Sequence, residues 1–451
     1  MTRGTDRRGT VLVIALGVGL VVRVVRLATD TLLHPDGPAY LGLAAELLDG
    51  RVRHVLGNYY SPLYPAAVAL VAATGVPLEL AGRMTALGAS LAALPLLYFA
   101  VHRMLGVRAA TAAVLVAALQ PALVKASVQV LPETLAGVVL LGWLLALPEA
   151  PVVAGVLAGA AYLVRPEGIM LLPLGLWRLR RQPFLRVRLV HATAAVLVML
   201  PVLLALRAET GHWQLSPREA RIAAGTGIPG ATSLAGAAVR APARLAGRIA
   251  LGIGEQTLHD AKALSPLLLL PFVAGLASAS VRRAAGWPLA VVAVITVVPL
   301  ALNPSPRYAV PLVPLFLPAV GAGLLALGER LGRWVRPAAA VLAVALVVQA
   351  LWVSHRADAA CSREVSALVL SRYGAGQPLV AVDGRFAYGA RGRALVPASN
   401  DPDAALGLAR RHGARLWLTR PRWLPKSWVA PPDVQPVARP CDGTFVLYEI
   451  G

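Results

Sequence analysis

Charged residues are scarce in this sequence. They make up 14% of its 451 residues, whereas an ordinary soluble domain has about 25%. Hydrophobic residues make up 57%, and they stand in runs long enough to cross a hydrocarbon core of roughly 30 Å, which takes about 20 apolar residues per helix. The scarcity of charge excludes a soluble globular protein, and the apolar runs predict an all-α polytopic membrane protein.

A basic domain is also lacking, although the net charge is +21. Lysine occurs only at Lys125, Lys262 and Lys426, and the arginines stand in short clusters between apolar runs, without an aromatic-interleaved basic groove. This absence excludes a nucleic-acid partner. Arginine clusters between apolar runs are instead typical of cytoplasmic loops in membrane proteins.

No convincing small-residue cleavage site follows the first apolar run, Val11 to Val22, so we interpret that run as a transmembrane helix rather than a signal peptide. Orienting the runs by their arginine clusters predicts about eleven crossings in an inner or plasma membrane. The amino terminus is then cytoplasmic and the carboxyl terminus extracytoplasmic. Residues 28–64 and 207–262 form external loops, and residues 243–262 are expected to form an amphipathic helix on the membrane surface.

Beyond residue 355 the composition changes to that of a soluble α/β domain, which predicts a division into residues 1–355 and 356–451. The elements expected in the second domain are helices near Arg363 to Tyr373 and Asp403 to His412, and strands Leu379 to Val382, Arg415 to Thr419 and Thr444 to Glu449.

Cysteine is nearly absent too. Cys361 and Cys441, the only two in the chain, lie near the two ends of the second domain. An extracytoplasmic compartment would let them form a disulfide. The alternative is a pair of buried thiols.

The predicted topology gathers polar residues in the external loops. Ionisable groups near membrane depth are costly, so a cluster on one side of the membrane indicates a functional site. The alternative is ordinary solvation of loops. The residues concerned are Asp36 in the first external loop, Glu133 in the second, Arg165 and Glu167 in the third, and Arg307 with Tyr308 in a late one.

Each candidate also has a structural interpretation. Asp36 lies among Pro35, Gly37 and Pro38, and a turn-capping aspartate has the same context. Glu133 follows a proline at a predicted helix start, where an acid compensates the helix dipole.

The arginines have two interpretations as well. Arg165 beside Glu167 predicts either a local ion pair or a binding group, whereas Arg307 at the mouth of a helix suits phosphate recognition through its planar donor fork. Arg26 lies near the outer end of the first helix. It either recognises phosphate as well or only extends its charged end to the membrane–water interface.

The order of these motifs resembles the GT-C membrane glycosyltransferases, in the branch of protein O-mannosyltransferases and aminoarabinose transferases. The similarity spans nearly all of the membrane part, and Phe386-Ala387-Tyr388-Gly389 is similar to the external domain of many bacterial members. The motifs are Arg26 followed by Pro-Asp-Gly-Pro-Ala-Tyr-Leu at 35–41, Ser-Pro-Leu-Tyr-Pro at 61–65, Leu-Pro-Glu-Thr-Leu at 131–135, Arg-Pro-Glu-Gly at 165–168, and Arg307-Tyr308 before Pro311 and Pro314.

The resemblance implies a polyprenyl-phosphate sugar as donor and a cell-envelope lipid, glycan or protein as acceptor. Asp36 would act as the general base of an inverting transfer, and Glu133 would orient a sugar or support a metal if one is used. The implied donor-phosphate ligands are Arg307, Tyr308, Arg165 and Arg26, and the implied substrate-orienting residues are Glu167, Tyr40 and Tyr64.

Two departures from the family pattern stand out. Gly37 occupies the place of the second first-loop acid, and the lysine that aminoarabinose transferases carry near Pro-Leu-Tyr is missing. The second departure argues against aminoarabinose as the sugar. No Asp-x-Asp stands in a membrane loop, so no required metal is expected.

Two other functions stay open. A lipid or solute transporter or flippase is disfavoured because no inverted repeat and no charge at the middle of a span is evident. A catalytically weakened relative that only binds lipid is suggested by Gly37.

Overall fold

The structure, a computed structural model, describes residues 3–180, 182, 184–218, 222–223, 226–228, 233–352, 356–397 and 401–451. The chain is 73% helical and forms two compact units. The first comprises Met1–Ala28 and Leu43–Trp352, and the second comprises Thr29–Gly42 and Val353–Gly451. The second unit thus contains part of the first external loop, which the sequence predicts to belong to the membrane domain.

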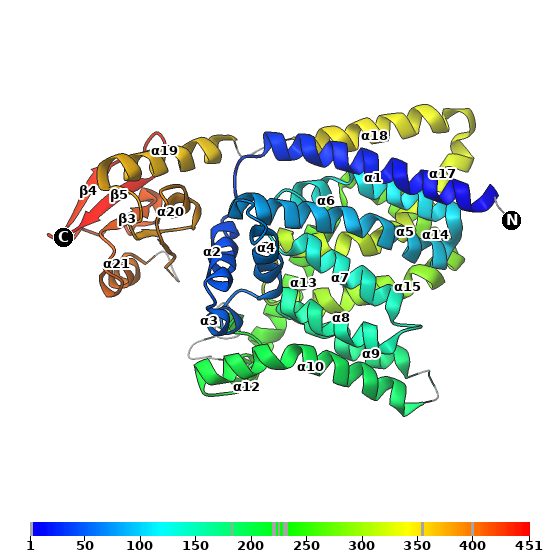
Figure 1. The fold of residues 1–451 in the computed structure, drawn as a ribbon, viewed down its shortest axis with the longest axis horizontal. Helices are drawn as coiled ribbons and strands as arrows, with labels where there is room; N and C mark the ends of the chain where they lie inside the picture. Colours follow the sequence, from blue (N-terminus) through cyan, green and yellow to red (C-terminus); the bar gives the residue numbers. More distant parts are fainter. Residues whose placement is uncertain are drawn as a thin grey trace. The chain divides into compact units, whose positions relative to one another are not determined.

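The first unit is a helical bundle (Figure 1). Its α-helices are α1 (Arg3–Thr29), α2 (Gly37–Leu48, which begins in the second unit), α3 (Val52–Leu56), α4 (Leu63–Ala72), α5 (Leu78–Leu119), α6 (Pro121–Ala126), α7 (Glu133–Ala146), α8 (Pro151–Val164), α9 (Leu171–Leu179), α10 (Leu185–Thr210), α12 (Leu234–Arg240), α13 (Pro242–Leu264), α14 (Pro266–Ala277), α15 (Ala279–Ile295), α16 (Pro306–Ala309), α17 (Val313–Leu331) and α18 (Val335–Leu351). Short 3₁₀ segments are η1 (Pro166–Met170), η3 (Val310–Leu312) and η4 (Gly332–Trp334), and η2 (Thr296–Leu300) is a π-helix.

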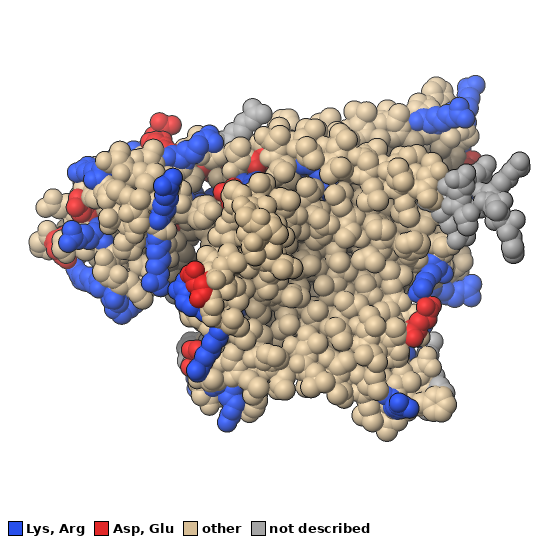
Figure 2. Space-filling view, in the orientation of Figure 1, with Lys and Arg blue, Asp and Glu red and all other residues tan. Residues whose placement is uncertain are grey.

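Among the residues that the structure describes, four helical segments are long and apolar enough to cross a membrane: Gly9–Thr29, Leu78–Leu119, Leu185–Thr210 and Pro306–Leu351. A fifth is added if α13 and α14, which meet at an angle of 101°, count as one span. On the face drawn in Figure 2, charged side chains gather at the two ends of the first unit, with a broad and mostly uncharged band between them. The chain is therefore a helical membrane protein, and the number of eleven crossings stays a prediction.

The helix α5 contains a break. Its 42 residues would extend about 63 Å at 1.5 Å per residue, roughly twice the thickness of the hydrocarbon core. Gly106 has a φ of 81° and is not helical. A residue with a side chain rarely adopts this conformation, whereas glycine adopts it readily. The break therefore divides α5 into two shorter helical segments, one before and one after Gly106.

The second unit contains a five-stranded sheet in the order β2-β1-β3-β5-β4. β1 pairs in parallel with β2 and β3, and β5 pairs antiparallel with β3 and β4. The strands are β1 (Leu379–Ala381), β2 (Ala394–Leu395), β3 (Leu416–Thr419), β4 (Val434–Ala438) and β5 (Val446–Ile450), and the helices are α19 (Arg356–Tyr373), α20 (Arg385–Gly389), α21 (Pro402–Arg411) and the 3₁₀ turn η5 (Pro421–Trp423).

Helices cover both faces of this sheet. Val365 and Val369 of α19 pack with Phe386 of α20 in one hydrophobic cluster, whereas Leu406 of α21 packs in another with Trp417. β3 is buried along its whole length because both of its faces are covered. Cys361 and Cys441 form a disulfide, the pairing that the sequence predicts.

Candidate active site

Glu133 and Arg165 form a buried ion pair. Glu133 is the first residue of α7, and Arg165 directly follows α8, the next helix along the chain. A short connection joins these two helices and reverses the direction of the chain, so the start of α7 and the end of α8 lie at the same end of the bundle (Figure 1). Arg165 Nη1 donates to Glu133 Oε1 at 2.9 Å, and the two side chains are 10% and 2% exposed.

Arg165 also contacts Glu167 across a tight turn. Its Nε donates to Glu167 Oε2 at 3.4 Å. Pro166 begins η1, and the Gly168 backbone then packs so closely on α8 that a Cβ at this position would lie 2.3 Å from the carbonyl carbon of Ala161. A larger residue at 168 would displace the turn. The guanidinium of Arg165 therefore bridges two carboxylates, one local and one from another helix.

Arg218 contacts the same site from a distant part of the chain. It is buried, its Nη1 lies 3.8 Å from Glu167 Oε1, and its guanidinium carbon lies 5.0 Å from the centre of the Tyr59 ring. The sequence alone did not point to Arg218, which stands in the long loop at 207–262. No motif marks it, and other arginines of that loop have a similar local context.

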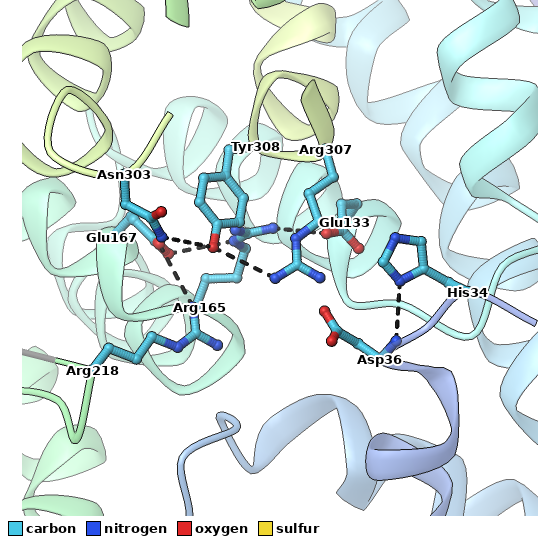
Figure 3. Close-up of polar contacts among 9 residues, drawn as sticks. All are labelled: His34, Asp36, Glu133, Arg165, Glu167, Arg218, Asn303, Arg307 and Tyr308. Carbon is cyan, nitrogen blue, oxygen red and sulfur yellow. Dashed lines mark hydrogen bonds and ion pairs between the residues drawn. The ribbon is translucent and has the colours of Figure 1, made fainter. Parts of the chain in front are cut away.

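Tyr308 lies beneath Arg165. The guanidinium carbon of Arg165 is 4.3 Å from the centre of the Tyr308 ring, a cation–π contact. The Tyr308 hydroxyl accepts hydrogen bonds from Asn303 Nδ2 at 3.4 Å and from Arg307 Nη2 at 3.5 Å. We call the whole group the polar cluster (Figure 3), and it consists of Glu133, Arg165, Glu167, Arg218, Asn303, Arg307 and Tyr308.

The polar cluster has more cationic than anionic groups. Three guanidinium groups, those of Arg165, Arg218 and Arg307, stand against the two carboxylates of Glu133 and Glu167, so the cluster carries one net positive charge. Burial alone would raise the pKa of Glu167, but attraction to Arg165 and Arg218 outweighs it and holds that pKa below its ordinary value. Burial would lower the pKa of Arg165, and Glu167 and Glu133 reverse the effect. Arg165 and Glu167 are therefore both charged at neutral pH.

Two small cavities adjoin the cluster. Arg165, Glu167 and Tyr308 contribute to the lining of one cavity of about 50 Å³. Glu133 and Thr134 contribute to a second of about 20 Å³. Within the part of the chain that the structure describes, the buried Oε2 atom of Glu133 has no hydrogen-bond partner. A buried carboxylate oxygen without a donor is costly, so this atom is suited to accept a hydrogen bond from a bound hydroxyl.

Asp36 and Tyr40 belong to the second unit. The backbone N–H of Asp36 donates to His34 Nδ1 at 3.2 Å (Figure 3), and that of Gly37 donates to the His34 carbonyl at 2.8 Å. These bonds form the turn from which α2 begins. The approach of Asp36 and Tyr40 to the polar cluster stays a prediction.

Arg26 and Tyr64 have structural partners in the first unit. The guanidinium of Arg26 is buried and donates to the carbonyl oxygens of Ala350 at 3.3 Å and Trp352 at 2.9 Å, where α18 ends. The Tyr64 hydroxyl donates to the Gly82 carbonyl of α5 at 3.0 Å. These contacts hold helices together, and the predicted roles of both residues toward donor and substrate stay predictions.

No group of three histidine, cysteine, aspartate or glutamate side chains that could hold a metal ion occurs among the described residues. Independence from metal is not tested by this observation and stays a prediction.

Comparison with solved structures finds the same fold in two kinds of protein. ArnT from Cupriavidus metallidurans superposes with a TM-score of 0.61 in the apo state (17% identity, 98% of each chain) and 0.59 when bound to undecaprenyl phosphate (16% identity, 97% of each chain). The archaeal oligosaccharyltransferase AglB from Archaeoglobus fulgidus, in complex with an inhibitory peptide and a dolichol-phosphate, has a TM-score of 0.57 at 12% identity over 93% of this chain and 70% of its own. This chain has the fold of both proteins. No family model and no curated protein sequence matches it.

Proposed function

We propose that this protein is a membrane glycosyltransferase, which moves a sugar from a polyprenyl-phosphate carrier to an acceptor hydroxyl at the extracytoplasmic face of the membrane. The observation that carries the proposal is the mostly buried polar cluster with its net positive charge, in a fold whose solved examples include one bound to undecaprenyl phosphate and one in complex with a dolichol-phosphate. A cluster with net positive charge attracts the phosphate of such a lipid and compensates for the water that the phosphate loses on binding.

Arg307 is assigned to the donor phosphate. Arg165 bridges Glu133 and Glu167, so its guanidinium serves as the framework of the cluster. Arg307 is half-buried beside Tyr308, at the start of α16. A guanidinium presents a planar fork of donors that matches the oxygens of a phosphate. As the sugar leaves the carrier, negative charge develops on that phosphate, and a fixed arginine stabilises it.

The acceptor hydroxyl attacks the anomeric carbon in the proposed reaction while the bond from that carbon to the phosphate oxygen breaks. The carbon is inverted, polyprenyl phosphate leaves with the bonding electrons, and the hydroxyl proton passes to the Asp36 carboxylate. General-base catalysis of this kind contributes roughly 10²- to 10⁴-fold. Because Gly37 stands in place of a second acid, Asp36 acts alone in the first loop. Glu133 Oε2 accepts a hydrogen bond from a sugar hydroxyl.

The disulfide supports the proposed orientation. Disulfides persist in oxidising compartments outside the cytoplasm, so Cys361 and Cys441 favour an extracytoplasmic second unit. The segment Thr29–Gly42 belongs to the same compact unit and hence to the same side of the membrane. Asp36 would then meet an acceptor of the cell envelope, and the amino terminus would be cytoplasmic.

The proposal is tested by incubating the purified full chain with a panel of polyprenyl-phosphate sugars and measuring release of free polyprenyl phosphate by mass spectrometry. We expect release that depends on an acceptor and is strongly reduced in Arg307→Ala. Binding of a donor without release would instead identify a lipid-binding relative. Movement of intact donor across proteoliposome membranes without cleavage would identify a flippase.

A further inference from the structure

A larger cavity lies at the other end of the helical bundle from the polar cluster. It has a volume of about 340 Å³, and Leu144, Leu147 and Pro148 line it where α7 ends. Glu133 stands at the start of the same helix, 11 residues before Leu144 and 14 before Leu147, which corresponds to roughly 17–21 Å along the helix axis. This cavity is therefore separate from the candidate active site, and a ligand bound in it is independent of the proposed function.

The lining of this cavity is amphipathic. Its apolar wall includes Met104, Leu144, Leu147, Trp287 and Pro288. Two arginines from different helices, Arg103 of α5 and Arg178 at the end of α9, add positive charge to it. The volume lies within the range of small-molecule sites, about 300–1,000 Å³.

The two arginines are available to a ligand. Arg178 is exposed and makes no hydrogen bond or ion pair with the residues that the structure describes. Arg103 donates to the Leu145 carbonyl at 3.2 Å and to Glu149 Oε2 at 3.3 Å. That ion pair is exposed, with side chains 49% and 68% accessible, so it contributes little energy and is easily exchanged for another anion.

One tryptophan that lines this cavity, Trp287, contacts two others. Trp177 and Trp287 stack with ring centres 5.4 Å apart, and Trp143 lies 6.1 Å from Trp287. Trp143 is buried, Trp287 is half-buried and Trp177 is exposed, so the rings lead from the bundle interior to its surface. Tryptophan is enriched where the hydrocarbon core of a membrane meets its headgroups. The cavity thus opens at headgroup level.

We propose that this cavity binds an anionic phospholipid of the adjacent membrane leaflet, with the phosphate between Arg103 and Arg178 and the glycerol and first acyl carbons against Trp287 and Leu144. An arginine fork recognises phosphate oxygens, and the apolar wall accepts the part of the lipid that water solvates poorly. A free phosphate ion would leave that apolar wall unoccupied, which favours the lipid as ligand.

Native mass spectrometry of the full chain in detergent, titrated with phosphatidylglycerol or phosphatidylcholine, tests the proposal. We expect phosphatidylglycerol to bind more tightly, and the variant Arg103→Gln/Arg178→Gln to weaken its binding by about tenfold or more, because the phosphate then loses both of its charged hydrogen-bond donors. Phosphatidylcholine carries the same phosphodiester, but its choline cation offsets the negative charge, so it should lose less affinity than phosphatidylglycerol in the double variant.

A matched control is Arg333→Gln, because Arg333 is also an exposed arginine beside a tryptophan, Trp334, and does not line the cavity. It should bind phosphatidylglycerol like the unaltered chain. Equal binding of the two lipids, or equal losses in the double variant and the control, would overturn the proposal. Displacement of phosphatidylglycerol by micromolar inorganic phosphate would overturn the choice of a lipid. A monodisperse elution profile verifies that each variant is folded.

Discussion

The Arg165 guanidinium and the Glu133 carboxylate meet at 2.9 Å in almost complete burial. Both groups stand at the ends of neighbouring helices, so the connection between α7 and α8 determines whether they meet. If Arg165 paired with Glu167 alone, the buried carboxylate of Glu133 would lack a countercharge. One arginine instead compensates two acids, and this is why the cluster is sensitive to its loss.

Replacement of Arg165 by methionine is expected to destabilise the fold by about 3–5 kcal/mol, because the change leaves Glu133 and Glu167 buried without their main countercharge. Thermal unfolding in detergent measures the effect. Arg51→Met is the control, since its ion pair with Asp49 is exposed and should contribute little. Equal shifts in the two variants would contradict the assignment of Arg165 as the framework of the cluster.

The stability of the cluster should depend on pH through Glu167. The pKa of Glu167 in the folded chain is below its ordinary value of 4.5, so its carboxylate stabilises the fold above that pH, and the contribution is lost as the pH falls from 4.5 through the folded-state pKa. Unfolding temperatures measured between pH 7 and pH 3 should fall less steeply for Glu167→Gln than for the unaltered chain. Parallel curves would show that Glu167 titrates no differently in the two states.

Arg307→Ala should reduce release of polyprenyl phosphate by about 10- to 150-fold, because the transition state loses a hydrogen bond between charged groups. Arg307→Lys keeps the charge but loses the planar fork, so it should recover only part of the activity. Arg283→Ala, an exposed arginine of α15, is the control. Full activity in Arg307→Lys would show that charge alone is required, and full activity in Arg307→Ala would remove Arg307 from the site.

Gln256 of α13 is expected to position Arg307. Its Oε1 accepts a hydrogen bond from the Ser305 backbone N–H at 2.9 Å, and its Nε2 donates to Asp260 Oδ1 at 2.9 Å. The other carboxylate oxygen of Asp260, Oδ2, accepts a hydrogen bond from the Thr296 hydroxyl. Gln256→Leu removes both bonds, so the start of α16 loses its anchor. We expect a lower kcat with partial rescue in Gln256→Asn.

The matched control for this prediction is Thr257→Val, the exposed neighbour on the same helix. A variant Gln256→Leu with unaltered kcat and only lower thermal stability would show that Gln256 is structural. A change in KM for the donor with unchanged kcat would place its effect on binding rather than on the transfer step.

The sequence predicts those parts of the site that depend on local signals. Arg165, Pro166, Glu167 and Gly168 form a turn because their own conformational preferences require it. The same holds for the C-terminal elements with clear periodicity, such as β3 and α21.

Long-range pairing could not be predicted in this way. Arg218 meets Glu167 across 51 residues of chain, and its burial follows from packing rather than from any motif. The sequence does not predict β4, since Pro436 lies within it and proline disfavours strands. Proline is tolerated there since β4 is at the edge of the sheet, where an N–H toward solvent is not needed. The association of Thr29–Gly42 with the C-terminal domain is equally non-local.

Asp36→Asn provides the most direct test of the chemistry. The turn at this position uses the backbone N–H groups of Asp36 and Gly37, both of which donate to His34, so an asparagine should leave the turn intact while removing the base. We expect transfer to fall roughly 10²- to 10⁴-fold, with donor binding retained and the acidic limb of the pH–rate profile abolished. Asp49→Asn, at an exposed site, should have full activity and an unchanged profile. If Asp36→Asn transferred sugar at the full rate, the proton would have to leave by another route. Asp36 would then be a turn residue and nothing more, and the missing acid at Gly37 would carry no consequence for the mechanism.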